Sequence, residues 1–277
     1  MRNITQEHIT RAVLDSLSDT PDPRLRRIFR SLVQHLHAFA RDVELTEAEW
    51  FAGIQFLTAT GQKSDDKRQE FILLSDVLGL SMLTVALNND KPAGCTESTV
   101  FGPFYVEGAS LCEQGDDIAR GAVGEPCEVT ASVRGLDGTP IANAVVDVWQ
   151  ADAEGRYDVQ RPELDHAQGR GQFRTDAEGR LRFRTVLAEA YPIPVDGPVG
   201  RFLGAANRHP WRPAHLHFMI QAPGYETLIT HVFKEGDAYL DSDAVFGVRQ
   251  SLVAPWTRRL EGGHALHYDF VLDARPA

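Results

Sequence analysis

The segment RPAHLHF, residues 212–218, carries two histidines at alternate positions of a run that reads as a buried strand. Alternate residues of a strand point to the same face, so His215 and His217 share one side. Leu216 and Phe218 point to the other side. Two imidazoles on one face can bind the same metal ion, with each nitrogen about 2 Å from it. An isolated pair of this kind is, however, more often two hydrogen-bonded core or edge histidines.

The residue types that could complete such a site decide which ion is expected. Zinc would require a cysteine, a third histidine or a carboxylate. A ferrous facial triad would require an acid close to the histidines, and the nearest acids, Glu226 and Glu235, give no HxD or HxE spacing. Tyr157 in EGRYDVQ and Tyr191 in EAYPIP lie next to turns, and a phenolate is a hard anion that suits a ferric ion. Taken singly, each tyrosine is more often an ordinary hydrogen-bonded boundary residue.

The composition argues against several classes of partner. The 277 residues carry a net charge of −11 without any basic run, and nucleic acids or anionic membranes require clustered Lys and Arg, so we expect neither partner. The longest apolar stretches are too short to span a bilayer, and the N-terminus MRNITQEHIT does not read as a secretory signal. Cys95, Cys112 and Cys127 lack CxxC spacing. Such cysteines favour neither a disulfide framework nor a thiolate zinc site, and they fit a reducing cytoplasm.

Apolar periodicity predicts four helices in the first ninety residues. The first two are expected over residues 5–17 and 23–43. The third follows the capping-box pattern TEAE at residues 46–49, and Gly61 is well placed to end it. The fourth is expected over residues 64–88 and is unusually apolar around FILLSDVLGLSMLTVAL. We expect other protein to cover that helix.

Short runs rich in Val, Phe and Thr then alternate with Gly, Pro and Asp turn clusters. Several short strands at this spacing indicate an antiparallel β-sandwich instead of βαβ units. The predicted fold class is therefore α+β, with a helical domain over residues 1–92 followed by a sandwich domain over residues 93–277. The boundary near residue 92 is a change of pattern, and the two parts could share one core.

Four segments together resemble the intradiol ring-cleaving dioxygenases, in particular their catechol and hydroxyquinol branch. They are TESTVFGPFYVEGA (96–109), PIANAVVDVWQADAEGRYDVQ (140–160), GRLRFRTVLAEAYPIPVDGPVG (179–200) and RPAHLHFMIQAPGYETLITHVF (212–233). The helical N-terminal part is similar to the linker domain through which that branch dimerises. The resemblance implies a homodimer, with room for a lipid-like tail between the helices. It also implies one non-haem Fe(III) per subunit, bound by Tyr157, Tyr191, His215 and His217.

The same resemblance implies a reaction on a small aromatic diol with O2. Ferric iron is a Lewis acid that makes the diol give up its protons, and the ring is then cleaved between its two hydroxyl-bearing carbons. In the family, the tyrosine at the position of Tyr191 leaves the iron and helps to take up a proton. The tyrosine at the position of Tyr157 stays bound. Arg212 would lie beside the ring and stabilise developing negative charge.

An acid on the apolar fourth helix bears on which diol is cleaved. Leu73 and Asp76 are three residues apart and share one helix face, and a buried acid is costly unless it contacts a polar group. We interpret Asp76 as the acceptor for a third substrate hydroxyl; capping, or pairing with an arginine, is the alternative. The remaining expected pocket residues are Val100, Phe101, Gly102, Pro103 and Phe104, which match the family's pocket loop, together with Ile193, Pro194 and Val245.

His231 marks a departure from the catechol-type pattern, in which a glutamine ends this strand. With the run GDAYLDSDAVFGV, the departure favours hydroxyquinol (benzene-1,2,4-triol) as substrate and 3-hydroxy-cis,cis-muconate, the enol form of maleylacetate, as product. Cleavage of catechol or chlorocatechol is the alternative within the family. A non-catalytic binding module is a further alternative, because residues 140–157 also resemble prealbumin-like sandwiches. His231 could serve as a donor behind the metal ligands or point outward.

Overall fold

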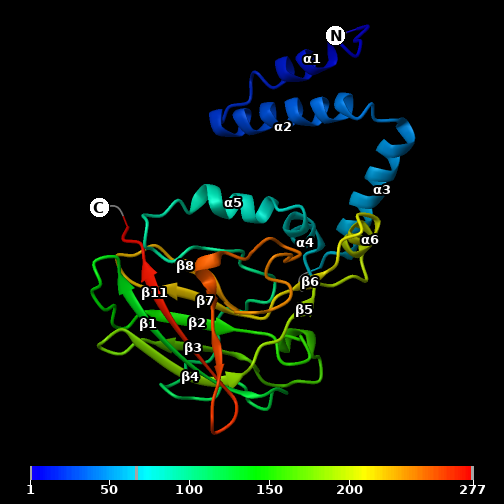
Figure 1. Ribbon diagram of the computed structural model, residues 1–277. Coiled ribbons are helices and arrows are strands. Elements are labelled where there is room, and N and C mark those ends of the chain that lie inside the picture. Colours follow the sequence, from blue (N-terminus) through cyan, green and yellow to red (C-terminus); the bar gives the residue numbers. More distant parts are fainter. Residues whose placement is uncertain (1, 66–67, 276–277) are drawn as a thin grey trace. The chain divides into compact units, whose positions relative to one another are not determined.

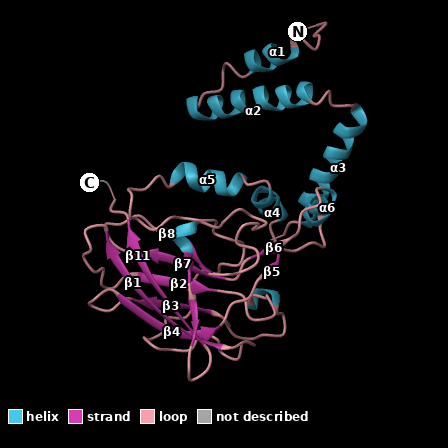
Figure 2. Ribbon diagram, in the orientation of Figure 1, coloured by secondary structure: helices cyan, strands magenta, loops and turns pink. Residues whose placement is uncertain are grey.

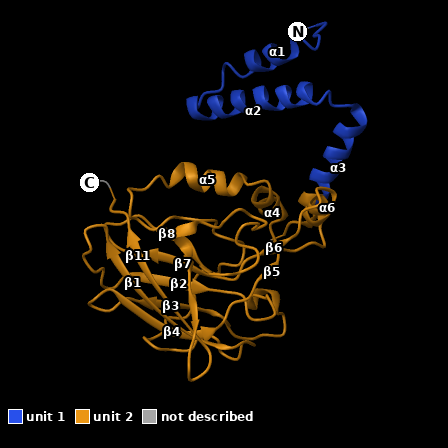
Figure 3. Cartoon of the chain, viewed as in Figure 1, with its two compact units in different colours: residues 1–59 blue, residues 60–277 orange. Residues whose placement is uncertain are grey.

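The computed structural model describes residues 2–65 and 68–275 (Figure 1). The chain forms two compact units, residues 1–59 and 60–277, which Figure 3 shows in different colours. The division precedes the helix that begins at Glu70, because that helix buries one face within the second unit. The domain boundary near residue 92 stays a prediction.

The first unit contains α1 (Ile9–Ser16), α2 (Pro23–Asp42) and most of α3 (Glu47–Lys63). A hydrogen bond of 2.9 Å joins Thr10 Oγ1 of α1 to His37 Nδ1 of α2. At the start of α3, the Glu49 amide donates to Thr46 Oγ1 and the Glu49 carboxylate accepts from the Thr46 amide, which confirms the predicted capping box. These three helices are confirmed, with ends a few residues from the predicted ones.

Gly61 does not end α3, which continues to Lys63. A glycine that ends a helix normally adopts a left-handed conformation, and Gly61 is not among the residues with positive φ. A Cβ at Gly61 would instead lie 3.6 Å from the Phe71 ring. That distance is an ordinary contact, so the Phe71 ring does not require a glycine here, and the predicted helix end was wrong.

The single helix predicted over residues 64–88 is wrong. Residues 66–67 lie outside the described residues, and the rest forms α4 (Glu70–Val77) and α5 (Leu80–Asn88), bent by 78°. Gly79, with a φ of 73°, supplies the left-handed residue at the bend. Among the described helices none is by itself long and apolar enough to cross a membrane, although the bent α4–α5 pair passes by length and composition. One face of α4 is buried, with Leu73, Leu74 and Val77, whereas α5 exposes Leu80, Leu83 and Leu87.

Two sheets form the second unit (Figure 2). The four-stranded sheet has the order β10 (Trp256–Arg258), β11 (His264–Leu272), β1 (Pro126–Gly135), β4 (Arg180–Val186). The five-stranded sheet has the order β3 (Arg170–Arg174), β2 (Val145–Trp149), β7 (His215–Gln221), β8 (Leu228–Lys234), β9 (Val253–Ala254). A two-stranded ribbon joins β5 (Tyr191–Pro192) to β6 (Trp211–Arg212), and the short helix α6 (Pro198–Ala205) lies between them in sequence.

One hydrophobic core fills the space between the two sheets. The rings of Phe173 and Phe183 lie 5.1 Å apart across it, and those of Phe218 and Phe270 lie 4.8 Å apart. The α+β class and the sandwich are confirmed. The sheets are mixed instead of purely antiparallel, because β1 pairs with β11, and β8 with β9, in parallel.

Candidate metal and substrate site

Strand β7 presents its two histidines on the face away from the core. Leu216 and Phe218 belong to the core between the sheets, so the alternation predicted from the sequence is confirmed. His217 pairs with Trp149 of β2 on one side and with His231 of β8 on the other. These three side chains therefore form one row across the sheet.

Backbone geometry brings the two tyrosines to this row. Tyr157 precedes a short 3₁₀ helix, Asp158–Gln160, whose first carboxylate forms a buried ion pair with Arg170. Tyr191 lies in β5 directly opposite Arg212 of β6. Gly155 allows the Tyr191 backbone to come close, since a Cβ there would lie 2.6 Å from the Tyr191 Cβ.

The donor atoms of Tyr157, Tyr191, His215 and His217 converge in the buried interior. Tyr157 Oη lies 2.8 Å from His217 Nε2 and 3.2 Å from Tyr191 Oη. His215 Nε2 lies 3.1 Å from His217 Nε2. Donors about 2.1 Å from a common ion and at right angles are about 3.0 Å apart, so this spacing fits a metal site.

Hydrogen bonding within the cluster supports the same interpretation. His215 Nδ1 lies 2.7 Å from the Pro213 carbonyl, which can only accept, so this nitrogen carries the proton. The other nitrogen of His215 therefore offers a lone pair to the cluster. His217 Nε2 faces both that lone pair and the Tyr157 hydroxyl. It would need a proton to donate to His215 and a lone pair to accept from Tyr157, and one nitrogen cannot do both. A metal ion satisfies all of these donor atoms together.

Burial keeps the two histidines neutral and disfavours a free phenolate. Desolvation and the nearby Arg212 charge lower the pKa of His215 to about 3. Desolvation, followed by repulsion from His215, places the pKa of His217 well below its usual value. Desolvation, followed by the nearby Tyr191, raises the pKa of Tyr157 well above its usual value. Neutral imidazoles are ready ligands, and a bound cation is the partner that a buried phenolate requires.

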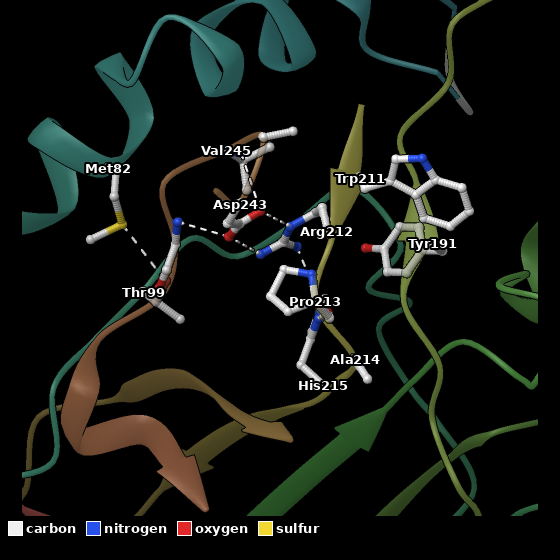
Figure 4. Close-up of polar contacts among 12 residues, drawn as sticks. Met82, Thr99, Tyr191, Trp211, Arg212, Pro213, Ala214, His215, Asp243 and Val245 are labelled. Carbon is white, nitrogen blue, oxygen red and sulfur yellow. Dashed lines mark hydrogen bonds and ion pairs between the residues drawn. The ribbon is translucent and has the colours of Figure 1, made fainter. Parts of the chain in front are cut away.

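Arg212 lies between Asp243 and His215 (Figure 4), and its predicted place beside a substrate ring stays a prediction. Its Nη1 is 3.3 Å from His215 Nε2, and its Nε is 3.1 Å from Asp243 Oδ1. Both side chains of this ion pair are almost fully buried. Although burial opposes the charge of Arg212, Asp243 raises the pKa of the guanidinium above its usual value. A fixed cation is therefore held next to His215.

Asp76 is buried on α4 at a position electrostatically coupled to Arg212. Desolvation raises the pKa of the Asp76 carboxyl, and the Ser81 hydroxyl and the Arg212 charge oppose that rise. Leu73, one turn earlier on α4, is also buried. A costly buried acid near a metal site fits the predicted acceptor for a substrate hydroxyl, and the contact itself stays a prediction.

The predicted pocket loop lies against Tyr157 and Trp149. The Phe104 ring stacks on Tyr157 at 4.3 Å. The Phe101 ring contacts the edge of Trp149 at 5.7 Å, and Trp149 in turn stacks on His217 at 4.7 Å.

The other predicted pocket residues differ in exposure. Val100, Ile193 and Val245 are buried, Pro194 is half-buried and Pro103 is exposed. The Val245 amide donates to Asp243 Oδ1 at 3.3 Å, which ties Val245 to the acid that pairs with Arg212. Contacts of these residues with a substrate stay predictions.

Sequence reasoning missed two residues at the site and left a third open. Asp243 was unassigned, although it lies within the run GDAYLDSDAVFGV that had been singled out. Trp149 was unassigned because its place beside His217 depends on strand register. His231 points inward: it is fully buried and stacks on His215 at 4.6 Å. The ligand atoms of the three histidines lie within 4.8 Å of one another.

Gly102→Ala tests how closely the loop approaches the metal ligands. Gly102 has a φ of 79°, and a Cβ there would lie 3.1 Å from His217 Cε1. We expect the affinity for the metal ion to decrease and turnover to fall about tenfold, because the new Cβ forces His217 to shift. Gly108→Ala is the matched control, with a φ of 78° and no atom within 4 Å of the new Cβ. Equal effects of both variants on turnover and metal content would contradict the close approach.

The helical region, the two-sheet sandwich and the four converging donors define a β-sandwich protein with a candidate metal site. Residues 100–274 match the family model "Dioxygenase", and residues 22–96 match "Catechol dioxygenase N terminus". The chain belongs to the intradiol ring-cleavage dioxygenases and is an enzyme, so the alternative of a non-catalytic module is not supported.

Three relatives illustrate the match. The chain is 64% identical over 273 residues to the 6-chlorohydroxyquinol 1,2-dioxygenase of Cupriavidus pinatubonensis, covering 99% of both chains. It is 51% identical to the hydroxyquinol 1,2-dioxygenase of Nocardioides simplex, covering 93% of this chain and 87% of that one. The crystal structure of hydroxyquinol 1,2-dioxygenase from Pseudomonas putida matches with a TM-score of 0.93 at 48% identity, covering 98% of this chain and 99% of that one.

Proposed function

We propose that this enzyme binds one Fe(III) per subunit and cleaves hydroxyquinol between its adjacent hydroxyl-bearing carbons with both atoms of O2. The product is 3-hydroxy-cis,cis-muconate, the enol form of maleylacetate. The observation that carries the proposal is the convergence of two phenol and two imidazole donors on one buried point. Fe(III) supplies the Lewis acidity that favours the substrate dianion, and phenolate ligands suit this hard ion.

Three side chains have separate roles in the proposed reaction. Tyr157 would remain a ligand, because the Phe104 ring stacks on it and the adjacent Asp158 is fixed by its ion pair with Arg170. Tyr191 would be a ligand of the resting site, and its Oη would accept a proton from the substrate. Arg212 stabilises the negative charge that develops on the ring, a role that fixed cations serve best in a dry site.

The assignment of hydroxyquinol rests on Asp76 and on the relatives. Two of the relatives compared above carry hydroxyquinol in their names, and a third carries 6-chlorohydroxyquinol. The Asp76 carboxylate accepts a hydrogen bond from the third hydroxyl, a group that catechol lacks. Catechol and chlorocatechol are the alternative substrates.

Asp76→Ala tests this assignment. We expect kcat/KM for hydroxyquinol to fall about tenfold or more, and that for catechol to change by less than about threefold, because only hydroxyquinol loses a charge-assisted hydrogen bond. The measurement is oxygen uptake with each substrate. Equal losses on both substrates would contradict the role of Asp76.

Asp76→Asn provides the matched control for folding. Burial raises the pKa of Asp76, so the folded carboxyl resists ionisation and the ionised form lowers stability at neutral pH. Removing the charge should therefore leave the melting temperature at pH 7 unchanged or higher. A large fall would indicate that Asp76 is mainly a structural residue.

Homodimerisation through the N-terminal helices is part of the proposal. An apolar set on α2 is exposed in the single chain: Leu25, Ile28, Phe29, Leu32, Leu36, Phe39. This apolar set would pack against the same set of a second copy, and the two helices could enclose an acyl chain of a lipid. Sedimentation equilibrium is expected to give twice the chain mass of 30.7 kDa, and a monomer would contradict the proposal. We also propose a cytoplasmic location, which the three free thiols support.

A further inference from the structure

Asp243 accepts hydrogen bonds from two sides of the candidate site (Figure 4). On one side it faces Arg212, with Nε 3.1 Å from Oδ1 and Nη2 3.3 Å from Oδ2. On the other side, the amides of Val245 and Gly247 donate to Oδ1 and Oδ2 at 3.3 and 2.9 Å. Each carboxylate oxygen thus joins the guanidinium to the loop over residues 243–247.

The arrangement directs one nitrogen of the guanidinium toward the candidate site. Nε and Nη2 are directed to Asp243, whereas Nη1 is directed to the metal ligand His215, 3.3 Å away. A planar guanidinium has a rigid fork of donors, so fixing two of its nitrogens fixes the direction of the third. The carboxylate therefore determines where the Nη1 donors point.

The loop around Asp243 has further anchors that do not involve its carboxylate. The Ala244 amide donates to the Trp211 carbonyl at 3.1 Å, and Arg208 Nη2 donates to the Ala244 carbonyl at 3.0 Å. Thr99 Oγ1 donates to the Gly247 carbonyl at 2.5 Å.

Space at the end of this loop is restricted by the same residues. A Cβ at Gly247 would lie 3.0 Å from Arg212 Nη2 and 3.2 Å from Asp243 Oδ2. The loop is therefore packed directly against the ion pair, and its anchors can be tested separately from the pair.

We propose that Asp243 is a positioning residue for the reaction: its carboxylate holds the Arg212 guanidinium so that Nη1 points at the bound substrate. The proposal rests on the proposed function for the substrate, the bound iron and the role of Arg212. The Asp243 carboxylate accepts hydrogen bonds from Arg212 and from the amides of Val245 and Gly247, so it acts on the site through Arg212. A misdirected cation would still attract a substrate anion but would not be aligned with the charge that develops during the reaction.

Asp243→Asn is the first test. We expect kcat to fall about tenfold to a hundredfold, while the anaerobic dissociation constant for catechol, read from the visible absorption of the iron-loaded protein, changes by less than about threefold. Asp147→Asn is a matched control, because Asp147 is a second buried carboxylate, with Gln172 as its side-chain partner on β3. Thr99→Val is the control for the loop. Both controls should keep kcat within about threefold of the parent enzyme.

A double-mutant cycle separates positioning from a structural role. We expect Arg212→Gln/Asp243→Asn to have the same kcat as Arg212→Gln alone, because Asp243 acts only through that arginine. If Asp243→Asn does not fold, the comparison of the double variant with Arg212→Gln still tests the positioning role. The double variant is expected to fold, since it leaves no unpaired buried charge. Multiplicative losses in the cycle, or a kcat for Asp243→Asn within threefold of the parent, would overturn the proposal.

The same variants distinguish this inference from the proposed function. If the parent enzyme cleaves catechol instead of hydroxyquinol, the substrate assignment fails, but the cycle can be measured on catechol. If Thr99→Val loses as much kcat as Asp243→Asn, loop anchoring explains the effect and the positioning role is overturned.

Discussion

Tyr157→Phe is expected to remove the visible absorption of the iron-loaded protein and to lower turnover more than about a hundredfold. Replacing a residue that only hydrogen-bonds to a ligand typically costs about tenfold to a hundredfold, and loss of a direct ligand should cost more. The phenol oxygen lies 2.8 Å from His217 Nε2 and 3.2 Å from Tyr191 Oη, so its removal opens the donor set. Absorption spectra and metal analysis after ferric loading would measure the effect.

Tyr268→Phe is the matched control for that variant. Tyr268 is a tyrosine of β11 whose hydroxyl donates to the Ser251 carbonyl at 2.9 Å. We expect this variant to keep the parent spectrum and turnover. If Tyr157→Phe keeps both its colour and its activity, the ligand set is wrong.

Arg212→Gln is expected to lower kcat by about a hundredfold to a thousandfold, the range found when one preorganised donor is removed from a charged transition state. The variant should also unfold at lower temperature, because Asp243 is left buried with only backbone donors. The measurements are steady-state kinetics, metal content and thermal unfolding.

Exposed Arg180 on β4 offers a control for arginine replacement, since its partners Asp176 and Glu178 are surface residues. Arg180→Gln should leave kcat and metal content unchanged. If Arg212→Gln binds the full amount of metal and retains more than about a third of the parent kcat, Arg212 has no role in the reaction.

Local sequence patterns predicted the parts of the site that depend on local rules. Alternation along a strand placed His215 and His217 on one face, and that prediction is confirmed by the burial of Leu216 and Phe218 in the core. The two tyrosines were candidates from their residue type and their place next to turns, whereas their assignment as ligands and the role of Arg212 came from the resemblance to the family. The structure brings all three side chains to the histidines. Periodicity also gave the helices of the first unit.

The errors have two physical origins. Gly79 lies inside a continuous apolar pattern, and helical periodicity does not reveal that its positive φ breaks the helix. Trp149 and Asp243 reach the site through strand register and loop closure, which depend on contacts between distant residues. His231 could not be assigned a direction for the same reason, because its place beside His217 is set by the pairing of β7 with β8.

Oxygen uptake by the iron-loaded enzyme, with hydroxyquinol and catechol assayed side by side, tests the central claim most directly. We predict that hydroxyquinol is preferred at least tenfold in kcat/KM, equivalent to about 1.4 kcal/mol of transition-state discrimination. A preference for catechol would retain the metal chemistry and contradict the role of Asp76. No uptake with either substrate, from protein that binds iron, would contradict the site itself.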